Sequence, residues 1–407
     1  MQLSQGHRAI EQPAGVLAWD VDPYDPAILS DPTEYYAELR AKGPFAYLSR
    51  YQMLACGRYH ETREVFSDWQ RFVSSRGVGL EDYKFEKPWR PPSLLLEVEP
   101  PYHDKTRFVA GCALSPKAVG ALKGLFASSA DRLIDELMAK GTFEAIADLA
   151  EAYPATVFPP AIGLQRCERQ LLVDYGKMVF NAMGPNNELR RLAMAKAPDV
   201  VPWIALQCRR ENLAPDGHGA LIYAAVDRGE VSEQEAGLLV RSLLTAGMDT
   251  TIAGIGNTLW CLATNPDQYE RLKAEPSLAR HAFEEALRYT SPVHSFCRTA
   301  HADTVVSGIW IEADTKILCV LGAANLDEDH WPEASRFDIG RKTAGHLALG
   351  VGIHGCVGQN LARAETIAML TAIATRVDSI ELAGDPIWQP GNSVHALARL
   401  PITFKAK

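Results

Sequence analysis

The chain has 407 residues, a length that allows two or three ordinary domains or one large helical unit. Hydrophobic residues make up 47%, enough for a sizeable core, and charged residues make up 22%, as in ordinary soluble proteins. The formal net charge of -9 argues against non-specific binding to nucleic acid, which requires a basic surface.

No internal repeat and no low-complexity linker divides the sequence, so we expect a single domain over residues 1–407. The eight cysteines contain no CxxC pair, which is typical of free thiols in a reducing compartment. The N-terminal segment has no basic lead into an apolar stretch, and we find no run near twenty apolar residues. These features predict a cytoplasmic protein that does not span a membrane.

The pattern of apolar positions predicts a mainly α chain with small β-sheets in the first and last quarters. In chain order, residues 33–42 are expected to be helical, 45–56 to hold short strands, and 88–92 to form a loop. Helical spacing dominates 115–268, with breaks expected at the prolines 154, 159, 160, 185 and 215. Alternating runs predict later strands within 304–311, 315–321, 379–382 and 400–404.

One helix stands out between Ser232, which forms a capping-box pattern with Glu235, and about Thr264. Asp249, Thr250 and Thr251 lie in its middle, in otherwise apolar company. Threonines in a core helix often bond back to carbonyls of the same helix, so they alone carry little functional weight. A carboxylate in a core must instead be paired or have a role.

The strongest local signal is the segment HLALGVGIHGCVGQNLARAE, residues 346–365, in which four glycines surround Cys356 and a helical pattern follows. Glycines let backbone N–H groups turn toward the sulfur at the positive end of a helix, which predicts a lowered thiol pKa and a thiolate. On this segment alone a nucleophilic cysteine is a competing interpretation. Zinc fits poorly, because His346 and His354 leave the site without a fourth ligand.

This segment resembles the haem-binding loop of the cytochromes P-450, and the resemblance implies that Cys356 is the axial thiolate ligand of a haem b iron. The match includes His354, Gly358 and the run 361–363. Leu349 departs from the family, which usually has phenylalanine there, and this substitution bears on the reduction potential. The resemblance also implies the P-450 fold, a triangular helical prism with a long central helix over the haem.

Three further motifs follow the family order. Glu285 and Arg288 match the ExxR pair, which we interpret as structural. Residues 246–251 match the oxygen-activation segment, which implies that Thr250 and Asp249 form the catalytic proton-handling pair. Each such residue alone would more often be a surface or core group. A clamp for the haem carboxylates is implied for His103, Arg107, Arg298 and His354.

Several stretches, among them 74–80, 87–93 and 145–154, resemble the bacterial P-450 group that oxidises para-substituted benzoates such as 4-methoxybenzoate. The resemblance implies carboxylate binding by Arg90, Ser93 and Ser242, charge tuning by Arg241, and a ring slot between Phe180 and Phe296. Met183 replaces an expected phenylalanine, which predicts a wider slot or a different acid, such as a 3-substituted benzoate or a cinnamate.

We therefore predict O-demethylation or hydroxylation of a small aromatic acid, using O2 and electrons from NAD(P)H through a reductase and a 2Fe–2S ferredoxin. A basic face over Cys356 is expected to receive that ferredoxin. Its candidate residues are Lys105, Arg341, Lys342 and Arg363. The alternatives are a tailoring hydroxylase of a larger secondary metabolite and a haem-thiolate sensor or electron carrier. The Asp249–Thr250 pair disfavours the sensor and a peroxygenase.

Overall fold

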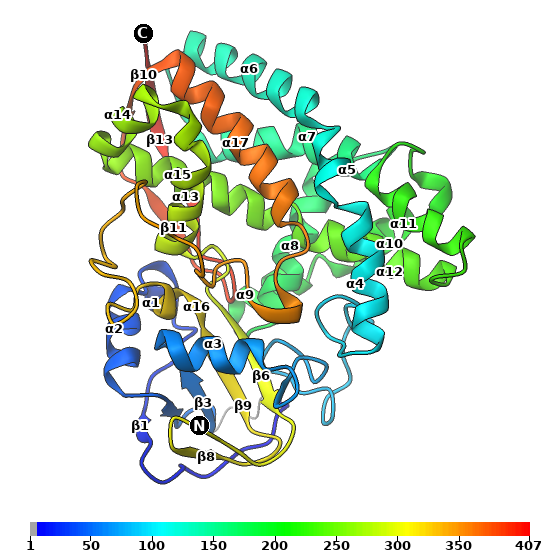
Figure 1. Cartoon of the computed structure of the whole chain (residues 1–407), viewed down its shortest axis with the longest axis vertical. Helices are drawn as coiled ribbons and strands as arrows, with labels where there is room; N and C mark the ends of the chain where they lie inside the picture. Colours follow the sequence, from blue (N-terminus) through cyan, green and yellow to red (C-terminus); the bar gives the residue numbers. More distant parts are fainter. Residues whose placement is uncertain (1–5) are drawn as a thin grey trace.

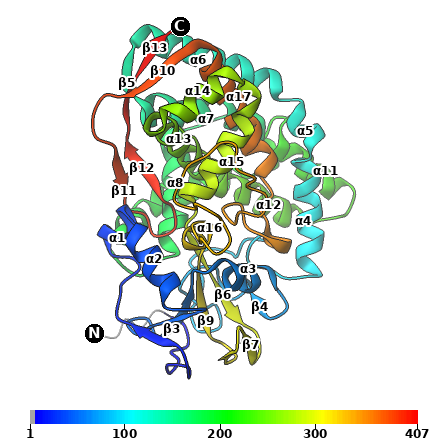
Figure 2. The same ribbon diagram turned by 60° about the vertical axis from the view of Figure 1, so that its left-hand side comes forward.

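The computed structural model describes residues 6–407 and is mainly helical (Figures 1 and 2). The α-helices are α1 (Pro26–Ser30), α2 (Thr33–Ala41), α3 (Tyr59–Ser67), α4 (Tyr102–Ala113), α5 (Pro116–Gly120), α6 (Lys123–Lys140), α7 (Ala152–Ile162), α8 (Arg169–Ala182), α9 (Glu188–Met194), α10 (Ala197–Gln207), α11 (His218–Asp227), α12 (Glu233–Ala246), α13 (Asp249–Thr264), α14 (Pro266–Ala274), α15 (Ala279–Thr290), α16 (Leu321–Asn325) and α17 (Gln359–Arg376). The strands are β1 (Leu17–Trp19), β2 (Ala46–Leu48), β3 (Met53–Cys56), β4 (Phe72–Val73), β5 (Thr142–Glu144), β6 (Ser295–Ala300), β7 (Thr304–Val306), β8 (Ile309–Ile311), β9 (Lys316–Val320), β10 (Val377–Leu382), β11 (Ile387–Gln389), β12 (Ala396–Arg399) and β13 (Pro401–Ala406).

The largest sheet joins strands from residues 17–73 with strands from residues 295–320, and it lies below the helical part in Figure 1. Its strand order is β1-β2-β3-β9-β6-β4, with β3 and β9 parallel and Cys56 opposite Cys319. The next strand, β6, runs antiparallel to β9 and places Phe296 opposite Cys319. Phe296 also lines the central cavity, so this sheet positions one wall of the site.

A C-terminal hairpin, β11 with β12, closes another side of the molecule (Figure 2). The Asn257 side chain of α13 donates to the His395 carbonyl at 3.0 Å. The buried Asn392 side chain donates to the Asn181 carbonyl of α8 at 2.8 Å. These bonds attach the hairpin to the two helices that carry the candidate catalytic and ring-packing residues.

Most predicted elements are confirmed, because their apolar periodicity is local and strong. The helix over 33–42 appears as α2, and the strand segments 304–311 and 315–321 appear as β7, β8 and β9. The capping box at Ser232 is also present, with bonds in both directions between Ser232 and Glu235.

The expected breaks at Pro154, Pro159 and Pro160 are wrong, since all three lie inside α7. A π-helical stretch, Ile146–Glu151, leads directly into this helix. Val157 and other apolar side chains of α7 are buried in the main core, and that burial offsets the missing proline N–H groups.

The long central helix is also not continuous, because it divides at Gly247–Met248 into α12 and α13. The hydroxyls of Thr250 and Thr251 donate to the Ala246 and Gly247 carbonyls at 2.6 and 2.9 Å. Such side-chain bonds compete with the backbone ladder and open it locally. By length and composition, Glu233–Thr264 could cross a membrane, but 56% of its apolar window is buried inside the protein, as in a core helix.

Candidate active site

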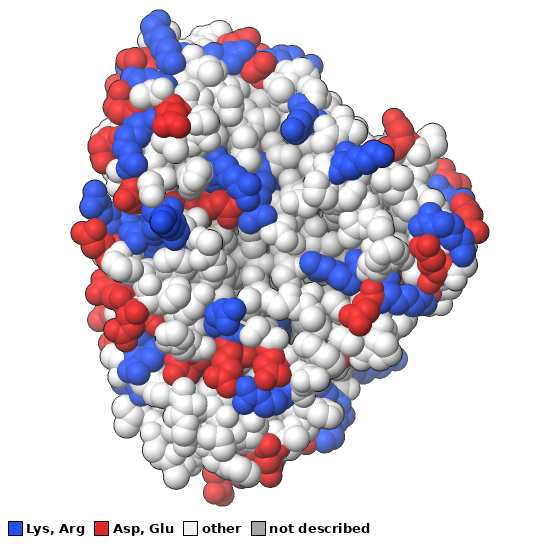
Figure 3. All heavy atoms as spheres, viewed as in Figure 1, with Lys and Arg blue, Asp and Glu red and all other residues white. Residues whose placement is uncertain are grey.

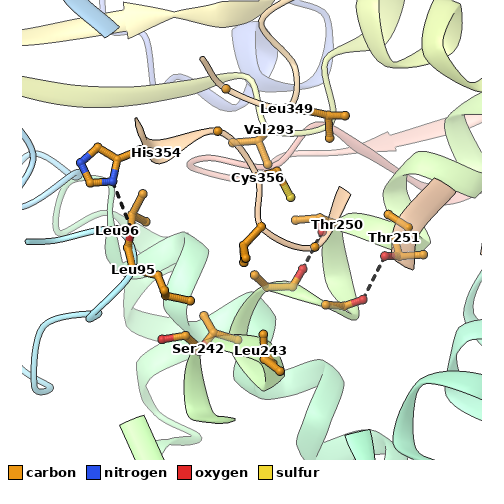
Figure 4. A pocket seen from close by; sticks show the side chains of 18 of the residues that line it. Leu95, Leu96, Ser242, Leu243, Thr250, Thr251, Val293, Leu349, His354 and Cys356 are labelled. Carbon is orange, nitrogen blue, oxygen red and sulfur yellow. Dashed lines mark hydrogen bonds between the residues drawn. The ribbon is translucent and has the colours of Figure 1, made fainter. Parts of the chain in front are cut away.

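Glycines shape the loop that carries Cys356. Gly350 and Gly352 both have φ of +71°, a left-handed conformation that favours glycine. The Cys356 N–H donates to the Leu349 carbonyl at 2.7 Å, which closes the loop just before α17 begins. Figure 4 shows the Cys356 sulfur pointing into a cavity that Ser242 and Thr250 also line.

The pKa of the Cys356 thiol differs from the predicted one. Burial raises the pKa of Cys356 above its ordinary value, although the backbone N–H of Gly358 and the charges of Arg107 and Arg363 lower it. The predicted pKa lowering by the loop alone is therefore wrong, because desolvation outweighs the N–H groups and cations. The cation and N–H donors still supply positive potential where a bound thiolate would need it.

The Glu285–Arg288 pair of α15 is fully buried, and its charged atoms are 2.8 Å apart. Arg288 also donates to the carbonyls of Asn325 and Ala334 at 2.8 and 2.9 Å. Arg341 reaches Glu285 at 3.0 Å from the loop that leads to Cys356. The geometry therefore suits the predicted structural role, since the pair ties distant backbone segments together.

Thr250 and Asp249 face different sides of α13. Thr250 lines the cavity with Cys356, whereas Asp249 is not among the lining residues and packs against Gly176 of α8. Burial raises the pKa of Asp249 to about 6, against the lowering effect of Lys177. A carboxyl group with this pKa can take up and release protons near neutral pH, on the α8 side of α13.

The four residues predicted to hold the haem carboxylates lie together. The His103 and His354 rings are 4.7 Å apart. Burial, Arg298, His103 and Arg107 combine to lower the pKa of His354 to about 3. Among the described residues, His103 Nε2 and Arg298 Nη2 are buried without a hydrogen-bond partner. A dianionic group would satisfy these donors, so the site fits a haem whose iron faces Cys356.

The polar end of the cavity joins α12 to the loop after residue 88. The Ser93 and Ser242 hydroxyls are 3.3 Å apart. Arg241 donates to the Pro91 carbonyl at 2.7 Å and has no ion pair within 4.0 Å among residues 6–407. The three predicted carboxylate-binding residues, Arg90, Ser93 and Ser242, line the same cavity, and so does Arg241, which was predicted to tune the local charge.

Sequence reasoning missed Glu97, whose side chain is only 1% exposed and pairs with Arg90 at 3.1 Å. It also accepts from the Tyr83 hydroxyl and the Ser93 N–H, both at 2.7 Å. Glu97 follows three leucines, and a carboxylate in such an apolar run is a signal that could have identified it. Because Glu97 neutralises Arg90, Arg241 carries the uncompensated positive charge at this end.

The predicted ring slot is present as a small apolar cluster. Phe180 and Val394 are buried in it, and Met183 and Phe296 pack against it. Phe180, Met183 and Phe296 all line the cavity. Leu243 and Val293, which the sequence did not single out, line it too, and Figure 4 labels both.

The predicted basic face is largely engaged in ion pairs. Lys105 pairs with Glu235 at 2.7 Å, Arg341 pairs with Glu285, and Arg363 pairs with Glu284. Lys342 is exposed. Figure 3, viewed as Figure 1, shows a central region with few charges, bordered by scattered basic and acidic side chains.

Known proteins resemble this chain over most of its length. The family model described as Cytochrome P450 matches residues 204–384. Cytochrome p450 CYP199A2 from Rhodopseudomonas palustris is 48% identical, over 96% of this chain and 95% of that protein. Vitamin D(3) 25-hydroxylase from Pseudonocardia autotrophica is 28% identical over 94% of this chain and 96% of that protein. The structure of cytochrome P450 CYP109Q5 from Chondromyces apiculatus has a TM-score of 0.79 and 30% identity, covering 95% of this chain and 99% of that one.

Proposed function

The chain belongs to the cytochrome P450 family, and from that premise we propose that it oxidises a small aromatic carboxylic acid such as 4-methoxybenzoate. It is a haem-thiolate monooxygenase that uses O2 and electrons from a redox partner, as the family implies. The finer proposal is that a 2Fe–2S ferredoxin and an NAD(P)H-dependent reductase in the cytoplasm supply those electrons. O-demethylation and hydroxylation are the proposed reactions.

The observation that carries this proposal is the polarity of the cavity. Ser93, Ser242, Arg90 and Arg241 gather at one end, and the apolar side chains of Phe180 and Phe296 lie along the rest. A small planar anion needs hydrogen-bond donors at one end and flat apolar walls, so that its far substituent is the group held nearest the iron. A neutral substrate would leave Arg241 without an anionic partner.

Cys356 would hold the haem iron, with His103, Arg107, Arg298 and His354 toward its carboxylates. When bound, the haem supplies the activation of O2 and the insertion of one oxygen atom into a C–H bond.

The protein's own part is to orient the acid and to supply protons. The Thr250 hydroxyl, now donating to Ala246, can turn toward the cavity and hold a proton there. Asp249, with its pKa of about 6, replaces that proton from the α8 side.

The test compares 4-methoxybenzoate with its methyl ester. A charge-assisted hydrogen bond is worth about 1.5–3 kcal/mol, so the acid should bind about ten- to several-hundred-fold more tightly. Binding is followed by the substrate-induced spin-state change of the haem. Arg90→Ala should reduce the difference in affinity between the acid and the ester. Equal binding of acid and ester would refute the aromatic acid proposal and direct the search to neutral substrates.

A further inference from the structure

A second cavity of about 990 Å³ lies outside the first, between α8, α10, α12 and the loop at residues 89–91. Its walls include Trp89, Tyr175, Val201 and Leu238. Val201 is 40% exposed, so the apolar lining extends to the surface. Arg209, Arg210, Glu211 and Glu233 line it as well. The described chain therefore has a largely apolar chamber, with aromatic side chains and a few charged ones in its wall, beside the site described above.

The two cavities share two residues, Arg90 and Arg241. The partition between them consists of side-chain hydrogen bonds, namely Arg241 to the Pro91 carbonyl and Ser93 to Ser242. No apolar side chain is common to both linings. The boundary is thus a polar septum that contains two guanidinium groups, those of Arg90 and Arg241.

On this boundary, Arg241 has N–H donors that its two hydrogen bonds do not use. Its two hydrogen bonds, at 2.7 and 3.3 Å, both leave from Nη2 and go to the carbonyls of Pro91 and Pro92. A guanidinium has five N–H donors, so Nε and Nη1 can serve another acceptor. Glu97 holds Arg90 but makes no ion pair with Arg241, so an anion is the natural partner for Arg241.

We propose that the outer cavity is a second binding site for an aromatic carboxylate, with Arg241 as the anchor of its acid group and Trp89 and Tyr175 beside its ring. This inference rests on the proposed substrate class. Arg241 then serves both sites, so an acid bound in the outer cavity already contacts the cation that binds its carboxylate in the inner cavity. The outer molecule lies beyond the septum from the haem and does not change the spin state.

The test compares two binding measurements on the holoenzyme, with 4-methoxybenzoate as the probe. Equilibrium dialysis measures all bound acid, whereas the spin-state change reports the acid beside the iron. We expect dialysis to show a second, weaker equivalent after the spin-state change has saturated. Coincident curves would overturn the outer site while leaving the proposed function intact. Absence of both signals would overturn both.

Two matched variants on α10 locate the second equivalent. Ala205 lines the outer cavity and not the inner one, so Ala205→Trp should fill it and remove the second equivalent. Leu206 is the next residue, 43% exposed and outside both linings, so Leu206→Trp should keep both equivalents. Persistence of the second equivalent in Ala205→Trp would overturn the proposal.

A third measurement starts from the unmodified protein. The fluorine signal of 4-(trifluoromethoxy)benzoate should relax in two classes on the paramagnetic holoenzyme, a fast class near the iron and a slower one beyond Arg241. A single class at saturating probe would count against the outer site. Arg241→Met should weaken the slower class about ten- to a hundredfold, as expected for the loss of a charge-assisted bond.

Discussion

The Cys356 side of the cavity and its substrate end are built from different contacts. On the Cys356 side, Glu285 and Arg288 are fully buried, and Arg288 donates to the backbone carbonyls of Asn325 and Ala334. At the substrate end, the walls contain Met183 and two serine hydroxyls 3.3 Å apart, and an arginine without an ion pair. Removing one member of a buried network leaves an uncompensated charge, whereas apolar walls with a flexible methionine can repack. The first side is thus suited to holding a cofactor in one position, and the second to accepting related ligands.

The largest expected effect is that of Cys356→Ser. Among the cysteines of residues 6–407, Cys356 alone lines the inner cavity, so no other thiol can replace it. The reduced carbon monoxide complex should lose its thiolate-type absorption completely. A normal spectrum in this variant would refute the ligand assignment and remove the basis for calling this side the cofactor side.

Arg288→Ala should lower the free energy of unfolding by about 3–5 kcal/mol, because Glu285 would remain buried with Arg341 as its one charged partner among the described residues. Chemical denaturation of the holoenzyme measures the change. The double variant Glu285→Gln with Arg288→Met is the control, and it should recover part of the loss. A change below 1 kcal/mol would show that this side is as tolerant as the other.

Lowering the pH should destabilise the substrate end of the cavity first. Burial lowers the pKa of His294 to about 4. Burial and the nearby His294 also lower the pKa of His395 to about 4, although Asp31 raises it slightly. Below pH 6.5 the unfolded imidazoles take up protons that the folded ones exclude. Stability therefore falls between pH 6.5 and 4, by on the order of 3 kcal/mol per imidazole.

Helix α15, which carries Glu284, Glu285 and Arg288, should hold to lower pH than the hairpin. Burial alone would raise the pKa of Glu284, but His346 and Arg363 bring it down to about 2. Its contribution is present above pH 4.5 and is lost as the pH falls through about 2. Hydrogen exchange should therefore show hairpin residues 387–399 losing protection near pH 5 while α15 keeps it. Simultaneous loss in both segments would contradict the comparison.

The smallest expected change in stability comes from Thr250→Ala, within about 0.5 kcal/mol, because its hydroxyl bonds only to the Ala246 carbonyl four residues earlier in the chain. Binding of the acid should survive, while reducing equivalents are diverted from product to hydrogen peroxide. The control is Thr250→Ser, which keeps a hydroxyl. Full coupling of electrons to product in the alanine variant would assign proton delivery to another group.

Sequence reasoning succeeded where the signal is local. The glycines around Cys356, the capping box at Ser232 and the alternating strands all depend on residues a few positions apart. It failed where tertiary packing decides. Burial keeps α7 helical through its prolines, and desolvation sets the direction of the Cys356 pKa.

The same contrast between local signals and tertiary packing explains which features of the candidate site could be predicted. The motifs identified several residues that line the inner cavity, among them Thr250 and Cys356, but they did not identify the partners of these residues. The pairing of Arg90 with Glu97 depends on how the loop at 89–97 folds back. Asp249 faces α8 because Gly176 leaves room for it there. Lys105 is engaged by Glu235 because α4 and α12 lie side by side.

The parallel pairing of β3 with β9 has a consequence for biosynthesis. Cys56 and Cys319 sit opposite one another, so the partner of β3 leaves the ribosome about 260 residues later. At roughly 5–20 residues per second, that interval is roughly 13–50 s. During this time the edge of β3 is an unpaired template for wrong strands. The cofactor donors are split in the same way, with His103 and Arg107 made early and Cys356 late. Haem insertion must therefore follow synthesis of nearly the whole chain, and a newly made chain depends on protection of that edge until then.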